Sequence, residues 1–239
     1  MAVGSLLTKT SKMPSKSLSK SAFACKVGAK LAKIENSVCF KCYALRGFYH
    51  MSNVKAKQER VKNFIEHKDF VPRMVATLYA ECYDDEYFRW WDSGDVWTVQ
   101  ECLDVLEVCE KTPWLKHWIP SKEYKLWRDA LKIRDVPKNA VVRFSTHMND
   151  FKPTQAGVHT STTFTVEGWE KRKEKMYTPE QVQEFYDNTT SKAKVGNICM
   201  AKKFSAENNR DKGKHKYSCG DCRDCWDDTV SNIAYPLRK

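Results

Sequence analysis

Short strand-like runs alternate with longer helix-like stretches along this chain. The strand-like runs are rich in aromatic and β-branched residues and fall at Tyr87–Trp91, Leu115–Ile119, Ala140–Ser145 and Val158–Val166. Apolar residues at helical spacing predict a helical stretch from Asn53 to about Ala80, with a break near Pro72. Further helices are expected after Thr98, from Tyr124 to about Lys132, and after Thr178.

Two of these helices have recognisable first turns. Thr98 is followed three residues later by Glu101, which is the spacing of a capping box. Thr178 is followed by Pro179, and proline is favoured at the first position of a helix. Both threonines are therefore predicted to be N-caps.

Strands that alternate with helices predict a parallel sheet with helical crossovers, either barrel-like or open. We expect an α/β fold, a partial or irregular (β/α) barrel with a cysteine-rich N-terminal loop and a C-terminal cluster-binding extension. Chemistry in such sheets lies beyond the carboxyl ends of the strands. This places four polar segments at one rim: the Cys39/Cys42 loop, Asp92–Asp95, Ser121–Glu123 and Ser145–His147. Of these residues, Asp92, Asp95 and Glu123 are the candidate catalytic groups.

The cysteines near the C-terminus form the most specific pattern in the chain. Cys219, Cys222 and Cys225 are each three residues apart, and Cys199 lies upstream of them. Thiolates at this spacing converge on a metal centre from a tight loop. Three cysteines in this arrangement are more typical of an iron-sulfur cluster than of zinc, which remains the alternative. Trp226, directly after the last cysteine, is expected to shield the centre from water.

A second group of cysteines lies near the N-terminus, at Cys25, Cys39 and Cys42. We therefore expect one or two 4Fe-4S clusters. The three other cysteines lie on apolar helical faces and are expected to be buried thiols: Cys82, Cys102 and Cys109. The predicted division of the chain is a basic N-terminal arm at 1–24, an α/β core at 25–195 and a cysteine-rich segment at 196–239.

Composition predicts a folded protein in a reducing compartment. The chain has 239 residues, of which 41% are hydrophobic and 12% aromatic. It has no run of about 18 apolar residues that would cross a membrane. Its first twenty residues are rich in Ser and Lys and lack the apolar region of a secretory signal. In the cytoplasm expected from these features, ten cysteines indicate metal ligands or buried thiols rather than disulfides.

The net charge of +11 favours a polyanionic partner. Basic residues gather at Lys9–Lys33, Lys55–Lys62, Lys171–Lys175 and Lys202–Lys216. Such a surface attracts nucleic acid through a salt-sensitive term that is independent of sequence. A solvated basic face without a partner is the alternative.

Four motifs occur in order over nearly the whole chain: Thr10-Ser11-Lys12-Met13-Pro14, Cys39-x-x-Cys42-Tyr43-Ala44-x-x-Gly47-x-Tyr49, Asp92-Ser93-Gly94-Asp95, and Cys219 to Trp226. Together they resemble the bacteriophage "gene product 88" domain family. The resemblance implies a phage or prophage origin and action in the cytoplasm of a host bacterium.

A looser resemblance is to radical S-adenosylmethionine enzymes. These enzymes have partial barrels in which three cysteines hold a 4Fe-4S cluster with one iron open to the methionine moiety. Cys39-Phe-Lys-Cys42-Tyr43 is similar to part of their cysteine loop. The resemblance implies cofactor binding by Tyr43, Ser93, Gly94, Asp95 and Ser145, with the Asp92–Asp95 turn receiving the ammonium group.

This chain departs from that pattern at one position, because its third cysteine, Cys25, lies well before Cys39. A long insertion can still deliver the thiolate, since loop length costs little entropy. If the C-terminal cysteines complete the N-terminal site, no iron is open, and the cluster is structural or transfers electrons from a donor. The rival function is therefore a non-catalytic iron-sulfur or zinc protein that binds nucleic acid or a host protein.

Overall fold

The strands in the described part of the chain form one open sheet of eight strands. The computed structural model describes residues 5–10, 13–154, 157–169, 177–201, 203 and 219–237. The strands are β1 (Leu7–Lys9), β2 (Lys16–Leu18), β3 (Tyr87–Trp90), β4 (Lys116–Ser121), β5 (Ala140–Ser145), β6 (His159–Thr165), β7 (Asn197–Ile198) and β8 (Asn232–Leu237). The helices are α1 (Lys26–Leu31), α2 (Ser52–Ile65), α3 (Phe70–Cys82), α4 (Val99–Lys111), α5 (Tyr124–Ala130) and α6 (Pro179–Asn188).

The order of the strands across the sheet follows their order in the chain until its last edge. The order is β1-β2-β3-β4-β5-β6-β8-β7, and every neighbouring pair except β1 with β2 is parallel. Consecutive parallel strands require crossover connections, and helices provide those between β3, β4 and β5. The carboxyl ends of these strands therefore meet at the same edge of the sheet.

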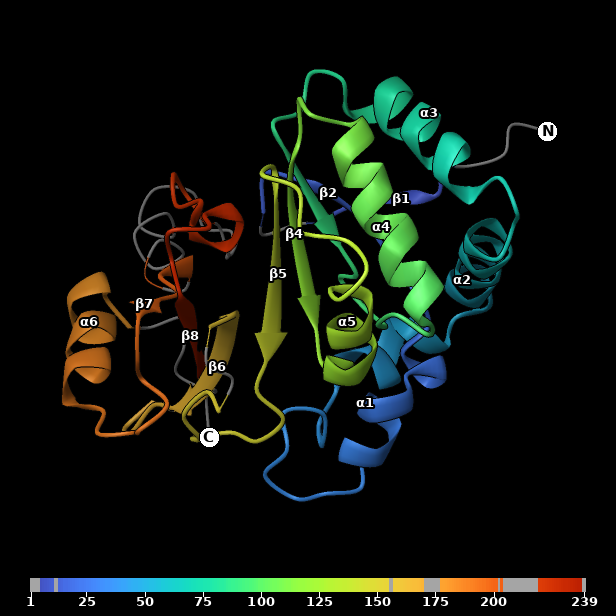
Figure 1. Ribbon diagram of the computed structural model, residues 1–239. Helices are drawn as coiled ribbons and strands as arrows, with labels where there is room; N and C mark the ends of the chain where they lie inside the picture. Colours follow the sequence, from blue (N-terminus) through green and yellow to red (C-terminus); the bar gives the residue numbers. More distant parts are fainter. Residues whose placement is uncertain are drawn as a thin grey trace.

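Helices α2 to α5 lie on one side of the central strands, as Figure 1 shows. The core between them is built from alternate residues of the strands, such as Phe88 and Trp90 of β3, which pack with Met74 and Leu106 from the helices. A smaller core joins β6 and β8 to α6 through Phe164, Tyr186 and other residues. No helix among the described residues is long and apolar enough to cross a membrane.

The sequence predicted the central elements well. β5 has the predicted bounds, and β3, β4 and β6 differ from theirs by one or two residues at an end. Thr178 accepts a hydrogen bond from the Gln181 amide and forms a full capping box, which confirms the predicted cap. Thr98 also caps its helix, but the Glu101 carboxylate accepts from the Trp97 amide rather than from that of Thr98.

Three other expectations need correction or refinement. The helical stretch after Asn53 breaks between Ile65 and Phe70, and Pro72 lies in the first turn of α3 instead of at the break. The basic arm predicted for residues 1–24 includes the strands β1 and β2, so it takes part in the sheet. The expected fold was a partial or irregular barrel, whereas the sheet of the described residues is mixed, mostly parallel and not closed.

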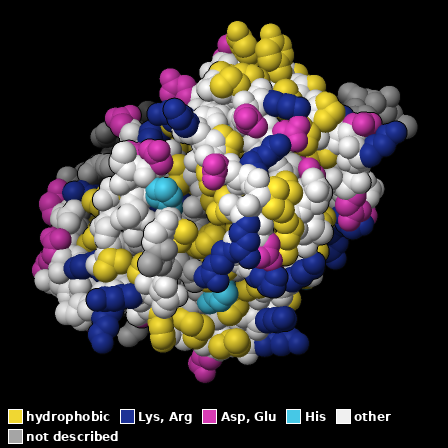
Figure 2. All heavy atoms as spheres, in the orientation of Figure 1, with side chains coloured by type: hydrophobic (Ala, Val, Ile, Leu, Met, Phe, Trp, Pro, Cys, Tyr) yellow, Lys and Arg dark blue, Asp and Glu magenta, His cyan; other side chains and the backbone are white. Residues whose placement is uncertain are grey.

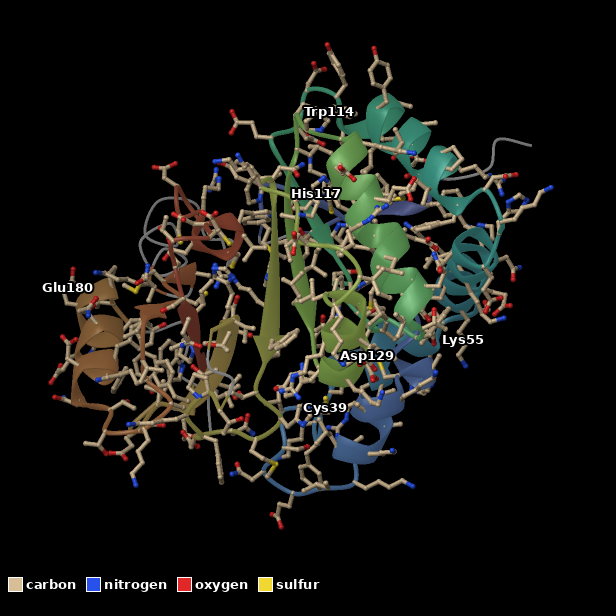
Figure 3. All side chains as sticks on the ribbon, in the orientation of Figure 1. Cys39, Lys55, Trp114, His117, Asp129 and Glu180 are labelled. Carbon is tan, nitrogen blue, oxygen red and sulfur yellow. The ribbon has the colours of Figure 1, made fainter. Side chains whose placement is uncertain are left out.

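One histidine, His117, is fully buried under α4 and is held neutral by its burial. The Trp90 indole donates to Nδ1 of His117 (3.3 Å), and Nε2 of His117 lies 2.9 Å from the Thr112 hydroxyl. That hydroxyl donates to the Val108 carbonyl, so His117 donates to it through Nε2. Burial lowers the pKa of His117 to about 3. Figure 3 shows His117 between α4 and the strands.

This histidine predicts an acid-sensitive fold. Between pH about 6.5 and pH about 3 the unfolded chain binds one more proton than the folded chain. The contribution of His117 to the free energy of unfolding is therefore fully present above pH 6.5 and falls by about 1.4 kcal/mol per pH unit below it. Urea denaturation over this pH range should show a shallower loss for His117→Gln than for wild type. The exposed-site variant His67→Gln should keep the wild-type slope, and equal slopes for all three proteins would contradict the assignment.

Candidate functional site

The two groups of cysteines, which are far apart in the sequence, line one cavity of about 460 Å³. Cys25, Cys39 and Cys42 line it on one side, and Cys199, Cys219 and Cys225 on the other. The cavity also includes the residues at the carboxyl ends of three consecutive strands: Asp92–Asp95 after β3, Ser121 and Lys122 at β4, and Ser145 and Thr146 at β5. The predicted clustering of these segments at one rim is therefore confirmed. Glu123, Cys222 and His147 are the members of the predicted set that do not line it.

The N-terminal cysteines lie close together around α1. A Cβ at Gly28 would lie 2.9 Å from the Cβ of Cys25, 3.5 Å from its sulfur and 3.9 Å from that of Cys39. Glycine at this position therefore allows Cys25 to approach the helix closely. Burial, together with the neighbouring Asp95 and Cys39, raises the pKa of Cys25 to about 12. Such thiols stay protonated until a metal replaces the proton. Figure 3 shows Cys39 next to α1, below α5.

The C-terminal cysteines are held against the sheet face opposite α4 and α5 (Figure 1). Cys225 lies in the short 3-10 helix Asp224–Trp226, and its sulfur is 3.3 Å from the Tyr235 hydroxyl of β8. The Cys199 amide donates to the Ala234 carbonyl of β8. Burial raises the pKa of Cys225 to about 12, and the nearby Cys199 and Cys219 act in the same direction. Cys222 does not line the cavity but lies close enough to Cys219 to raise the pKa of that thiol.

A single buried arginine organises this loop. The Arg143 side chain projects from the middle of β5 and is fully buried. Its guanidinium donates to four backbone carbonyls of the loop, those of Asp224, Cys225, Asp227 and Val230, at 2.6 to 3.0 Å. Two of these carbonyls, those of Asp224 and Asp227, also accept from the Asp227 and Val230 amides. Arg143 therefore fixes the backbone beside Cys225 relative to the sheet.

Trp226 provides the second attachment of the loop. Its indole donates to the Phe88 carbonyl of β3 at 2.9 Å, and its ring packs edge-on against Tyr87 and Trp118. The residue is 5% exposed, so it covers this face of the sheet with apolar surface. Trp226 does not line the cavity, and the shielding of a metal centre expected from the sequence stays a prediction.

The Asp92–Asp95 turn is fixed by the N-terminal segment. The Lys20 amide donates to the Ser93 carbonyl, and the Ser93 hydroxyl donates to the Lys20 carbonyl. Gly94 has a φ of +80°, and a Cβ there would lie 2.4 Å from the Cβ of Lys20. Only glycine fits such a close approach in this backbone conformation. The Lys20 ammonium is buried, pairs with Glu101 at 2.5 Å and lies over the ring of Trp97.

The two aspartates of the turn have different surroundings. The Asp95 carboxylate is buried and accepts hydrogen bonds from the Ser121 hydroxyl and from the Val96 and Lys122 amides. Burial raises its pKa, and these hydrogen bonds lower it. In contrast, Oδ1 of Asp92 is buried without a hydrogen-bond partner among the described residues. Asp95 is thus fully engaged in joining β3 to β4, whereas Asp92 can still accept a hydrogen bond.

The remaining sequence candidates are placed by their own hydrogen bonds. Tyr43 donates from its hydroxyl to the Asp92 carbonyl. Ser145 accepts from the hydroxyl of Ser161 at the cavity wall. Glu123 is buried beneath α1, where its carboxylate accepts from the Val27 amide at 2.8 Å, and burial raises its pKa. This position makes Glu123 an anchor for the cysteine-bearing segment.

The cysteines as arranged do not converge on one ion. Among the described residues, no group of three or more His, Cys, Asp or Glu side chains could hold a metal ion. The three cysteines expected to be ordinary thiols, Cys82, Cys102 and Cys109, are buried as predicted. Parts of the sequence motifs, namely Ser11 and Lys12, the basic run 171–175 and most of the run 202–216, lie outside the described residues.

Sequence reasoning missed several residues of the cavity. Arg89 and Trp118 line it from β3 and β4, and Tyr235 lines it from β8. One signal was available for Arg89, because it lies between Phe88 and Trp90 and must point to the opposite face of the strand. Nothing local in the sequence indicated that this second face would be covered by the C-terminal loop.

The motifs that occur in order along the sequence belong to an open α/β sheet, and their two cysteine groups meet at one cavity. A family model described as "Gene product 88" matches residues 3–228. The chain therefore belongs to the gene product 88 family. No curated protein and no solved structure matched the chain.

The loop geometry gives a direct prediction. Arg143→Met removes four hydrogen bonds to buried carbonyls, so we expect a loss of about 3 kcal/mol or more in the free energy of unfolding. Hydrogen exchange should also accelerate in residues 219–230. The control Arg134→Met removes only surface ion pairs with Glu107 and Glu110 and should cost less than about 1 kcal/mol. Equal losses in the two variants would show that Arg143 does not hold the loop.

Proposed function

We propose that this protein is an iron-sulfur enzyme that resembles radical S-adenosylmethionine enzymes and works in the cavity at the rim of its sheet. The observation that carries the proposal is the meeting of both cysteine groups with the Asp92–Asp95 turn in that one cavity. Cysteine thiolates are the ligands of 4Fe-4S clusters. In a protein without disulfides among the described residues, six cysteines that line one cavity favour this chemistry over a structural role.

The proposed first cluster is held by Cys25, Cys39 and Cys42. Three thiolates leave one iron of a 4Fe-4S cluster open, which is what binding of S-adenosylmethionine requires. Such a cluster would supply a single electron for reductive cleavage of that cofactor. The long segment between Cys25 and Cys39 is brought back by α1 and by the anchor at Glu123, so the distant third cysteine, Cys25, is compatible with a three-thiolate site.

The proposed second cluster is held by Cys199, Cys219, Cys222 and Cys225. Four thiolates close a cluster, so this centre would relay electrons or anchor a substrate. The Arg143 clamp holds only the backbone of the loop, which leaves the thiols able to converge when metal enters. Metal ligands commonly reach their final arrangement only on binding. Zinc in the same ligands is the alternative cofactor, with a purely structural role.

The Asp92–Asp95 turn is the proposed site for the amino group of S-adenosylmethionine. The unpartnered oxygen of Asp92 offers an acceptor for an ammonium group, and Ser93 and Gly94 hold the turn in place. Asp95, whose carboxylate is already satisfied, positions the turn, and Tyr43 and Ser145 line the cavity beside it. The finer form of the proposed fold is a partial or irregular barrel, and the consecutive parallel strands with helices on one side support it.

The alternative function is a non-catalytic cluster protein that binds nucleic acid or a host protein, or accepts electrons from a donor. One observation favours a binding surface: large apolar side chains are exposed around the N-terminal cysteines, including Phe23, Phe40, Phe48 and Met51. Figure 2 shows Lys and Arg side chains spread over the face in view, with Asp and Glu between them. With a phage origin, the protein would work in the cytoplasm of its host.

The metal content tests the proposal. Two 4Fe-4S clusters predict about eight irons and eight sulfides per chain after anaerobic purification. The variant Cys25→Ala should lose about half of the iron, because only the first cluster depends on this residue. The control Cys102→Ala removes a buried thiol of α4 and should keep the full iron content. Zinc in place of iron, or unchanged iron in Cys25→Ala, would contradict the proposed ligands.

The turn makes a separate prediction about the cofactor. Asp92→Asn keeps the size of the side chain but removes its charge, so binding of S-adenosylmethionine should weaken about tenfold or more. Iron content and melting temperature should stay at wild-type values. Isothermal titration under anaerobic conditions measures the affinity, with the exposed Asp84→Asn as the charge-matched control. An affinity equal to that of Asp84→Asn would remove Asp92 from the cofactor site.

A further inference from the structure

Arg89 is a cation that faces the cavity from the middle of the sheet. Its neighbours Phe88 and Trp90 are buried in the core on the helix side, so the alternation of the strand turns Arg89 to the opposite face. There it lines the cavity together with Trp118 of the next strand. The site thus holds a positive group that neither cysteine motif includes.

The guanidinium packs against an aromatic ring of the cavity wall. Its central carbon lies 4.6 Å from the ring centre of Trp118, within the range of a cation–π contact. One terminal nitrogen lies 3.8 Å from the sulfur of Met13, which is a weak acceptor. A guanidinium in these contacts can still form stronger, charge-assisted hydrogen bonds with an anionic ligand.

Arg89 has no counter-ion in the described part of the chain. None of the ion pairs there involves it, and its Nε is buried without a hydrogen-bond partner. A partly buried cation without a partner is costly unless something else neutralises it. The two acidic side chains of the cavity do not do so, because Asp95 is engaged at β4 and Asp92 makes no hydrogen bond through Oδ1.

Further unpartnered donors lie in the same cavity wall. The indole nitrogens of Trp91 and Trp118 are buried and have no hydrogen-bond partner among the described residues, and the same is true of the Thr146 hydroxyl. All three residues line the cavity. Buried polar groups are nearly always paired, so a set of unpaired donors at one place indicates a ligand rich in acceptor atoms.

We infer that Arg89 binds an oxyanion, a carboxylate or a phosphate, on the substrate that enters this cavity. The guanidinium would form paired hydrogen bonds with two oxygen atoms, and Trp118 and Trp91 would supply further donors and flat apolar walls. A cavity of about 460 Å³ has the size of a small-molecule site. The ligand class is therefore a small molecule that carries an anionic group beside a ring. This inference goes beyond the cluster chemistry and holds whichever metal the cysteines bind.

The test compares matched charged and neutral probes on the anaerobically purified protein. Thymidine 5′-monophosphate against thymidine examines a phosphate, and phenylacetate against phenylacetamide examines a carboxylate. We expect the charged member of one pair to bind about tenfold or more tightly than its neutral partner, which is the effect of a charge-assisted hydrogen bond. The pair that shows this preference identifies the source of the oxyanion.

Variants show which residue produces the preference for the charged probe over its neutral partner. This preference should disappear in Arg89→Gln and weaken in Arg89→Lys, which keeps the charge but loses the planar guanidinium. The control Arg73→Gln removes an arginine that is stacked on Phe64, away from the cavity, and should keep the preference. The inference fails if neither charged probe is preferred, or if the preference survives in Arg89→Gln. It also fails if Arg89→Gln loses iron as Cys25→Ala does, because Arg89 would then balance the charge of the metal centre instead.

Discussion

The hydrogen bonds between the Arg143 guanidinium and the C-terminal loop are the interaction on which the site depends. One face of the central sheet is covered by α2 to α5, whereas on the other face, within the described residues, the short 3-10 helix Asp224–Trp226 contacts β4 and β5 (Figure 1). The loop that carries Cys219 to Cys225 covers part of this face. It has little regular structure of its own, so its carbonyls need donors from outside. Arg143 supplies four such bonds from the middle of β5, and the loop's own Trp226 indole donates one hydrogen bond to a carbonyl of β3.

A second constraint brings the N-terminal segment to the same place. β2 joins the sheet beside β3, and the backbone of Lys20 pairs with Ser93 in the turn that follows β3. The buried ion pair between Lys20 and Glu101 then joins this contact between Lys20 and the turn to the start of α4. Because the chain leaves this point directly into α1 and the N-terminal cysteines, the two cysteine groups approach one cavity from opposite ends of the sequence. The cavity is therefore a product of the topology, and no single motif forms it.

The sequence predicted those parts whose signals are local. β3, β4, β5 and β6 are short runs of aromatic and β-branched residues, and the N-caps at Thr98 and Thr178 have fixed spacings to their partners. The rim was also predictable, because parallel strands place their carboxyl ends together. The edge strands could not be predicted in this way. β1 and β2 are three residues long and polar in sequence, and their strand conformation comes from pairing of β1 with β2 and of β2 with β3. The roles of Arg143 and Arg89 depend on which face of the sheet the distant loop covers, which no local pattern encodes.

The central claim is that the cavity holds an iron-sulfur cluster with one iron open to S-adenosylmethionine. Electron paramagnetic resonance of the reduced, anaerobically purified protein, with and without S-adenosylmethionine, tests this claim most directly. The account predicts the signal of a reduced 4Fe-4S cluster that changes when the cofactor is added. A cluster signal that is indifferent to the cofactor would mean that four thiolates close the site and that the protein transfers electrons or has a structural cluster. The absence of any iron signal, with zinc bound instead, would contradict the account altogether.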